Sequence, residues 1–194
     1  MTDFTIENKY QGLIIAGVDE AGRGPFAGPV VAGAVIVNPK NIISGIKDSK
    51  KLTKRKREEL YLAITNNCIW SVGIVSSEDI DQINILEATK KACRLAVESL
   101  TKRPEIVIVD GNMKFNDQRF KSIIKGDDKS ISIAAASIIA KVTRDQIMEE
   151  LGQKFPQYKW HKNSGYGTKE HRQAIKDHGL TEHHRKSFKF SLPA

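Results

Sequence analysis

The sequence predicts a mixed α/β fold, in which one five-stranded sheet is flanked by helices. Five short apolar runs end in turn-forming or polar residues, as strands typically do. The chain begins with strands and then alternates helices with strands. This order favours a mixed sheet over the fully parallel, doubly wound kind.

Each predicted strand is short, apolar and closed by residues that turn the chain. The first is followed by glycines, and the second is β-branched and closes at Asn38-Pro39. Three later runs repeat the pattern. The predicted strands are GLIIAGVD (12–19), VVAGAVIV (30–37), CIWSVGIV (68–75), EIVIVDG (105–111) and FKSIIKG (120–126).

Two helices are predicted in the first half of the chain. One opens at Thr53, which is a good N-cap, and ends at Asn66-Asn67. The other carries an apolar stripe at three- and four-residue spacing, which indicates a helix face laid against the core. The stripe consists of Leu86, Thr89, Cys93, Ala96 and Leu100.

Two further helices are predicted in the second half. One runs from about 131 to 155, where the small residues AAAS permit close packing on the sheet and Pro156 stops the helix. The other follows the N-cap Thr168 and ends at Gly179, before a last basic piece at 181–188. We expect the chain from about Pro156 to form a helical segment that flanks the sheet.

Composition indicates a single basic domain. The chain has 31 Lys and Arg against 23 Asp and Glu, a net charge of +8, which favours polyanionic partners. Residues 1–11 are polar and lack the features of a secretory signal, so we expect one domain over 12–194 in a soluble, cytoplasmic protein. Cys68 and Cys93 lack metal-ligand spacing and are expected to be buried thiols.

The stretch GVDEAGRGPFAGP (17–29) allows two kinds of site. Its glycines and an alanine match the dinucleotide-binding pattern G-x-G-x-x-A, but prolines interrupt the loop and a β-type run follows in place of a helix. Asp19 and Glu20 would repel a phosphate that arrives without a cation. Bound Mg²⁺ or Mn²⁺ removes that objection, because the ion joins carboxylates to phosphate oxygens.

Acids recur at the ends of three predicted strands. Asp19 and Glu20 end the first and Asp110 the fourth. Asp127 follows the fifth, with Asp128 beside it. Acids at the ends of neighbouring strands converge on one point, where they can hold metal ions. Consecutive strand residues point to opposite faces, so we expect the first strand to end at its acid pair.

Seven motifs run in order along nearly the whole chain: GVDEAGRGPFAGPV, DSKKLT (48–53), VDGN (109–112), KGD (125–127), SIAAASIIAKVTRD (132–145), GYGT (165–168) and EHHRKSF (182–188). Together they resemble the bacterial type 2 ribonuclease H family, ribonuclease HII. The resemblance implies a ribonuclease H-like fold, with a five-stranded mixed sheet flanked by helices and a C-terminal helical segment that closes over the substrate.

The resemblance implies four catalytic, metal-binding acids, which fall on Asp19, Glu20, Asp110 and Asp127. In the family the fourth acid directly follows Lys-Gly, which selects Asp127 over Asp128. Asp145 lies within a predicted helix, and we expect it to pair with Lys141 or Arg144.

The resemblance also implies how substrate is bound. Backbone groups of a Gly-Arg-Gly segment sense the ribose 2′-hydroxyl and a tyrosine stacks on the adjacent sugar, which are roles that fall on Gly22, Arg23, Gly24 and Tyr166. Phosphate contacts are predicted at Lys50, Lys51, Asn84, Ser137 and Lys141. The alternative for each is a solvated surface charge or a residue that packs a helix. We expect His183 and His184 at the surface or facing phosphates, and Phe188 and Phe190 to pack at the core's edge rather than bind a partner.

The resemblance predicts an endoribonuclease that hydrolyses the RNA strand of RNA–DNA hybrids and cuts on the 5′ side of single ribonucleotides embedded in duplex DNA. Two Mg²⁺ or Mn²⁺ ions are implied, with 3′-hydroxyl and 5′-phosphate products. The protein is expected to be a monomer that binds no membrane, and recruitment by a replication protein is left open.

Two alternatives are weighed against this prediction. A type 3 ribonuclease H carries an extra N-terminal domain, for which the eleven residues before the first strand leave no room, and a Gly-Lys-Gly loop where this chain has Gly-Arg-Gly. A non-catalytic nucleic-acid-binding module would need no acids, whereas all four are present.

Overall fold

The computed structural model describes residues 2–190 and contains the predicted five-stranded mixed sheet. The strands lie in the order β3-β2-β1-β4-β5. β2 pairs antiparallel with β1 and β3, whereas β4 pairs in parallel with β1 and β5, so β1 and β4 end at the same edge. The strands are β1 (Ile15–Ala21), β2 (Val30–Ile36), β3 (Ile69–Val75), β4 (Ile106–Asp110) and β5 (Phe120–Ile123).

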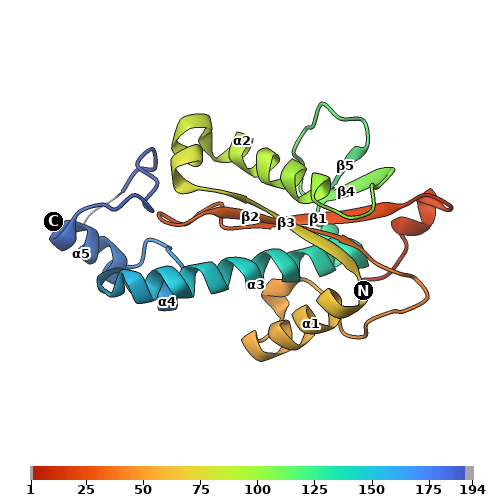
Figure 1. The fold of residues 1–194 in the computed structure, drawn as a ribbon, viewed down its shortest axis with the longest axis horizontal. Coiled ribbons are helices and arrows are strands. Elements are labelled where there is room, and N and C mark those ends of the chain that lie inside the picture. Colours follow the sequence, from red (N-terminus) through yellow and green to blue (C-terminus); the bar gives the residue numbers. More distant parts are fainter. Residues whose placement is uncertain (1, 191–194) are drawn as a thin grey trace.

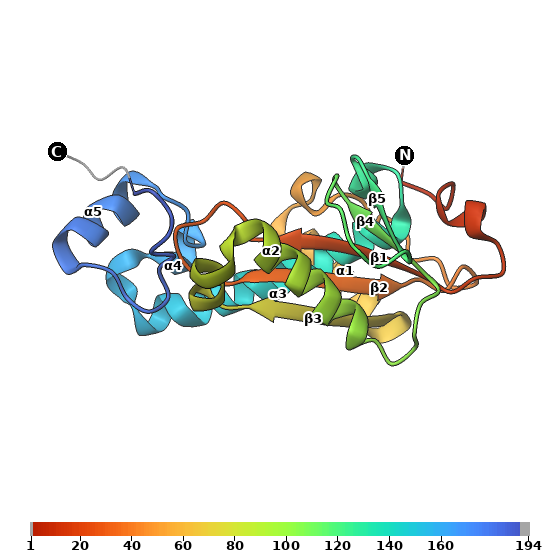
Figure 2. The ribbon, with the colours of Figure 1, turned by 90° about the horizontal axis from the view of Figure 1, so that it is seen from above.

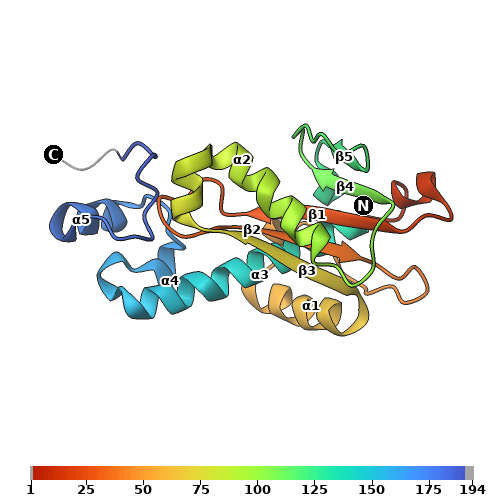
Figure 3. The same cartoon turned by 45° about the horizontal axis from the view of Figure 1, so that its top comes forward.

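Helices cover both faces of this sheet (Figures 1 and 3). α2 packs on one face, and α1 and α3 lie on the other. Thr53 and Thr168 cap their helices through their side chains, as predicted. The helices are α1 (Lys54–Asn67), α2 (Ser77–Glu98), α3 (Ile131–Lys154), α4 (Trp160–Asn163) and α5 (Lys169–His178), with short 3₁₀ turns η1 (Glu7–Tyr10), η2 (Ser49–Lys51), η3 (Gly126–Asp128) and η4 (Pro156–Tyr158).

α3 approaches the central strands closely because glycines face it. A Cβ on Gly17 of β1 would lie 2.1 Å from the carbonyl carbon of Ser132, and one on Gly33 of β2 would lie 2.5 Å from the carbonyl oxygen of Ala136. The small residues 134–137 of α3 are all buried against this surface. The close helix–sheet packing predicted from AAAS is therefore confirmed, and it brings α3 beside the acid-bearing end of β1.

The predicted stripe of α2 is only partly correct. Thr89, Cys93 and Ala96 are fully buried, but Leu86 is 41% exposed. Asn84 interrupts the helix with a φ of 66°, and its Oδ1 accepts the N–H groups of Leu86 and Glu87. Leu86 therefore lies in the first turn of the helical segment that begins after Asn84, where it is more exposed than the rest of the stripe.

The segment before β1 and the helices α4 and α5 lie at opposite ends of the sheet (Figure 2). α4 and α5 pack around a small apolar cluster that includes Met148, Tyr158 and Trp160. The basic piece at 181–188 is not helical. At the other end, Asp3 forms a β-bridge with Ser130, so residues before β1 contact the start of α3. Among the described residues, no helix combines the length and the apolar character that crossing a bilayer requires.

Candidate active site

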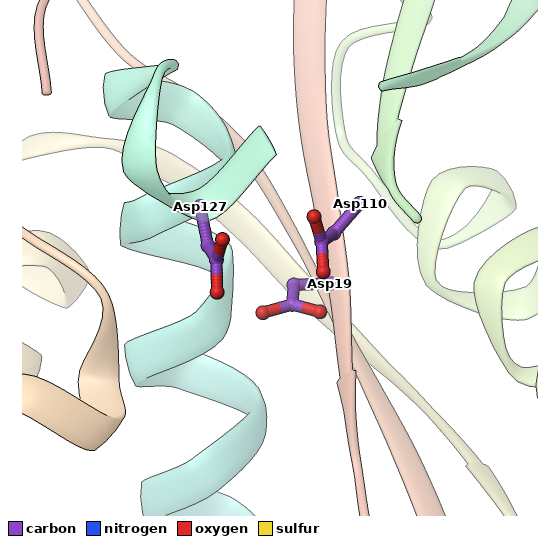
Figure 4. Close-up of side chains that lie close together, drawn as sticks. All are labelled: Asp19, Asp110 and Asp127. Carbon is purple, nitrogen blue, oxygen red and sulfur yellow. The ribbon is translucent and has the colours of Figure 1, made fainter. Parts of the chain in front are cut away.

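Three carboxylates from three separate elements converge at the edge where β1 and β4 end (Figure 4). Asp19 lies near the end of β1, Asp110 ends β4 and Asp127 lies in η3. One oxygen of each lies within 4.8 Å of the others. The N–H of Gly126 donates to Asp110 Oδ1 at 2.7 Å, which joins η3 to the end of β4. The strand-end prediction is thus confirmed for these three acids.

The cluster is electrostatically strained without a cation. Asp19 is 5% exposed, and burial, with the nearby carboxylates of Glu20 and Asp110, raises its pKa well above the usual range. Burial, with Asp110, likewise raises the pKa of Asp127. Crowded, buried carboxylate oxygens are what Mg²⁺ or Mn²⁺ prefers as ligands, and such an ion would relieve the repulsion. The residues present therefore fit a divalent metal site.

Glu20 lies next to this cluster but outside it. β1 continues through Ala21, with Glu20 paired to Ala32, so the expectation that the strand ends at the acid pair is wrong. In a regular strand Glu20 and Asp19 point to opposite faces. Arg23 Nη1 donates to Glu20 Oε1 at 3.4 Å. Burial raises the pKa of Glu20, with Asp110 adding to the shift and Arg23 opposing it, so Glu20 still senses the cluster.

Two lysines of η2 face the acids of η3. Lys50 Nζ lies 3.7 Å from Asp127 Oδ2. Although burial opposes the shift, Asp19 and other nearby carboxylates raise the pKa of Lys50, so it is charged at the site. Lys51 pairs with Asp128, whose side chain is 42% exposed and lies outside the cluster. The geometry thus separates Asp127 from its neighbour.

The other predicted phosphate contacts lie on helices. Lys141 Nζ contacts Asp145 at 2.6 Å, which is the pairing expected for that acid. Asn84 forms the kink of α2. Ser137 is 3% exposed, and its hydroxyl accepts the N–H of Ser49 at 3.2 Å. The Ser137 hydroxyl therefore binds the backbone of η2. A direct phosphate contact by this hydroxyl stays a prediction.

Two buried arginines, Arg144 and Arg185, hydrogen-bond to the loop between β1 and β2. The sequence did not predict these contacts. Arg185 is fully buried and Arg144 is 1% exposed. Arg185 donates to the carbonyls of Gly22, Arg23, Pro25 and Gly28 at 2.6–3.0 Å. Arg144 donates to those of Ala27, Pro29 and Ser164 at 2.9–3.1 Å. The loop carbonyls are thereby turned inward.

The exposed part of this loop has backbone donors that the described residues leave unused. Arg23 and Gly24 are exposed, and no hydrogen bond among the described residues uses their N–H groups. A Cβ on Gly24 would meet only Tyr166 Cε1, at 3.6 Å. Tyr166 itself is 50% exposed. Gly22 differs, since its φ is +96° and a Cβ there would lie 2.0 Å from Arg144 Nε. Gly22 is thus packed against the protein, whereas Arg23 and Gly24 are exposed.

Two buried histidines, His171 and His184, contact each other, and His171 contacts the backbone of Tyr166. His171 Nδ1 lies 2.9 Å from the carbonyl of Tyr166, and its Nε2 accepts from Trp160 and lies 3.2 Å from His184 Nε2. Burial, with His171 and His183, lowers the pKa of His184 to about 4, so it is neutral at pH 7. The prediction that His184 lies at the surface or faces phosphate is wrong, because it is 1% exposed. The half-buried Phe188 and Phe190 pack against the apolar clusters, as expected.

Comparison with known proteins decides the family. The family model for Ribonuclease HII matches residues 16–191. The chain belongs to the ribonuclease HII family. The Ribonuclease HII of Rickettsia canadensis (strain McKiel) is 68% identical over 185 residues, which cover 95% of this chain and 94% of that one. The chain is therefore a ribonuclease H enzyme, and the alternative of a non-catalytic module is set aside.

Solved ribonuclease H structures share the fold. In the PCNA:RNase HII complex from Archaeoglobus fulgidus, the matched chain has a TM-score of 0.78 and 31% identity, over 94% of this chain and 98% of that one. Bst-RNase HIII in complex with Mn²⁺ has a TM-score of 0.71 over 94% of this chain and 70% of that one. Its identity is 20%, so this likeness shows the fold alone and gives the type 3 alternative no further support.

Proposed function

We propose that this ribonuclease H hydrolyses the RNA strand of RNA–DNA hybrids and cuts on the 5′ side of single ribonucleotides embedded in duplex DNA. The observation that carries the proposal is the Asp19–Asp110–Asp127 cluster close in the chain to a loop where Arg23 and Gly24 are exposed and no described residue accepts their N–H groups. Such a site would bring phosphate chemistry close to sugar recognition. The products would carry 3′-hydroxyl and 5′-phosphate ends.

The acids bind the metals in this proposal. Asp19 and Asp110 would be central ligands, with Asp127 and Glu20 flanking them. Bound there, two Mg²⁺ or Mn²⁺ ions would activate the attacking water and stabilise charge on the leaving 3′ oxygen. Bst-RNase HIII, which shares the fold, was solved in complex with Mn²⁺. Lys50, which contacts Asp127, would orient a non-bridging phosphate oxygen beside the cluster.

The loop and Tyr166 would read the sugar. A ribose 2′-hydroxyl needs close backbone approach, and the exposed Gly24 leaves room for it. The N–H groups of Arg23 and Gly24 are the unused donors there, and the ring of Tyr166 is beside them to stack on the adjacent sugar. Lys51, Lys141 and Asn84 would contact flanking phosphates, with Ser137 supporting the η2 loop.

The remaining proposals concern context. We treat 12–194 as one catalytic unit of a cytoplasmic monomer that acts on nucleic acid. The Archaeoglobus relative was solved with PCNA, but here Phe188 and Phe190 pack against the protein's own body. They are accordingly not offered as a tail that docks on a replication protein.

Charge-removing variants test the acid assignments. Asp19→Asn and Asp110→Asn should abolish cleavage of a labelled DNA duplex that contains one ribonucleotide, because each removes a cluster ligand. Duplex affinity, measured by fluorescence anisotropy in EDTA, should stay within about threefold of wild type. Asp128→Asn is the matched control, since Asp128 is an exposed neighbour paired with Lys51. Full activity in either cluster variant would sink the assignment.

A further inference from the structure

The residues before β1 contact the turn that carries Asp127. Glu7 of η1 is 7% exposed, although it lies in a segment expected to be merely polar. Its Oε1 accepts from Ser130 Oγ at 2.6 Å and from the N–H of Ser132 at 3.0 Å. These partners lie 123 and 125 residues away along the chain. Glu7 Oε2 is buried and has no hydrogen-bond partner within residues 2–190.

Ser130 is hydrogen-bonded both to the first turn of α3 and to the η3 turn. Its Oγ accepts the N–H of Ile133 at 3.1 Å, so it is the N-cap of α3. Its own N–H donates to the carbonyl of Gly126 at 2.8 Å, which closes the η3 turn over Asp127. The N–H of Gly126 in turn donates to Asp110 Oδ1. Fixing Ser130 therefore fixes the turn that sets Asp127 against Asp110.

We propose that Glu7 is a positioning residue, which caps α3 and holds Ser130 so that the η3 turn presents Asp127 to the metal ions. The Glu7 carboxylate, which accepts the N–H of Ser132 in the first turn, also interacts favourably with the dipole of this long helix. Groups that hydrogen-bond directly to a metal ligand typically change metal affinity or activity 10- to 100-fold when removed. Glu7 acts one step further away, through Ser130, so we expect the lower end of that range. The segment before β1 is thus part of the catalytic architecture.

The inference rests on the proposed metal site, and direct metal binding tests it without substrate. Isothermal titration calorimetry of the full chain with Mn²⁺ should give a dissociation constant about tenfold higher for Glu7→Ala than for wild type. In an Asp127→Asn background, Glu7→Ala should cause no further loss, because the ligand it positions is already gone. Additive losses in the double variant would overturn the proposal.

Two further variants separate positioning from general destabilisation. Leu60→Ala truncates a buried side chain of α1 that takes no part in the hydrogen bonds joining Glu7, Ser130 and Gly126, and it should lower the unfolding temperature without changing Mn²⁺ affinity. Glu7→Gln keeps an oxygen that can accept both hydrogen bonds, so its affinity should stay within about threefold of wild type. A tenfold loss in Glu7→Gln, or unchanged affinity in a folded Glu7→Ala protein, would refute the role. Wild-type protein that binds Mn²⁺ but makes no cut at a ribonucleotide would instead count against the proposed function alone.

Discussion

Arg185→Lys should loosen the loop between β1 and β2 while leaving the metal cluster in place. A lysine keeps the charge but carries its donors on one nitrogen, which cannot reach the four carbonyls that the guanidinium fork now satisfies. If two buried carbonyls lose their donors at about 1–3 kcal/mol each, the variant loses about 2–6 kcal/mol of stability. Because small domains are stable by about 5–15 kcal/mol, the variant should still fold at low temperature.

The effect on activity should exceed the effect on metal binding. If the loosened loop no longer holds the N–H groups of Arg23 and Gly24 in position, two hydrogen bonds of about 1 kcal/mol each are lost from the transition state. This corresponds to about a 30-fold fall in kcat/KM on a duplex with one ribonucleotide. Mn²⁺ affinity should be unchanged, since Arg185 touches none of the three acids of the cluster.

The assay measures kcat/KM, Mn²⁺ affinity and thermal unfolding on the same preparation at a temperature where the variant is folded. Arg119→Lys is the matched control, because Arg119 is a partly exposed arginine that pairs with Asp117 outside the site. It should change kcat/KM less than twofold. Arg185→Lys protein that is destabilised yet cleaves the ribonucleotide duplex as well as wild type would refute the reasoning.

Two other predictions follow from the same site. Gly22→Ala should destabilise the protein strongly, because the φ of Gly22 is +96° and an added Cβ would overlap Arg144. Gly24→Ala is the control, and its unfolding temperature should lie within about 2 °C of that of wild type. Equal unfolding temperatures of the two variants would contradict the prediction. In metal-free protein, burial and neighbouring carboxylates raise the pKa of Asp19, so its contribution to stability is present below the ordinary pKa of about 3.9 and lost as pH rises through the raised value. As pH rises over that range, the unfolding temperature of Asp19→Asn should therefore rise relative to that of wild type, and added Mn²⁺ should reverse this change. A difference in unfolding temperature that does not change with pH would contradict the burial argument.

The sheet and three of the acids were predictable because their signals are local. Short apolar runs with turn residues place each strand, and parallel neighbours bring Asp19 and Asp110 to one edge whatever the details of packing. Asp127 is predictable in the same way, because its turn follows the last strand. Glu20 was harder, since whether a strand ends one residue earlier depends on its pairing with β2.

The loop's supports and the buried histidines depend on distant contacts that leave no local signal. Arg185 reaches Gly22 across 163 residues, and in a chain with 31 Lys and Arg a buried arginine looks like any surface one. His184 stands in a basic run typical of surfaces, yet it is buried between aromatic rings. Glu7 lies in a polar segment, and only the folded chain shows that it caps α3.

The most direct test of the account is to map cleavage on two labelled DNA duplexes that are identical except for a single 2′-hydroxyl. With Mn²⁺ or Mg²⁺, the account predicts one cut on the 5′ side of the ribonucleotide, 3′-hydroxyl and 5′-phosphate ends, no cut in the all-deoxy duplex, and none in EDTA. Equal cleavage of the two duplexes, or a cut elsewhere in the ribonucleotide duplex, would contradict the claim that the carboxylate cluster and the 22–24 loop act together on a ribose.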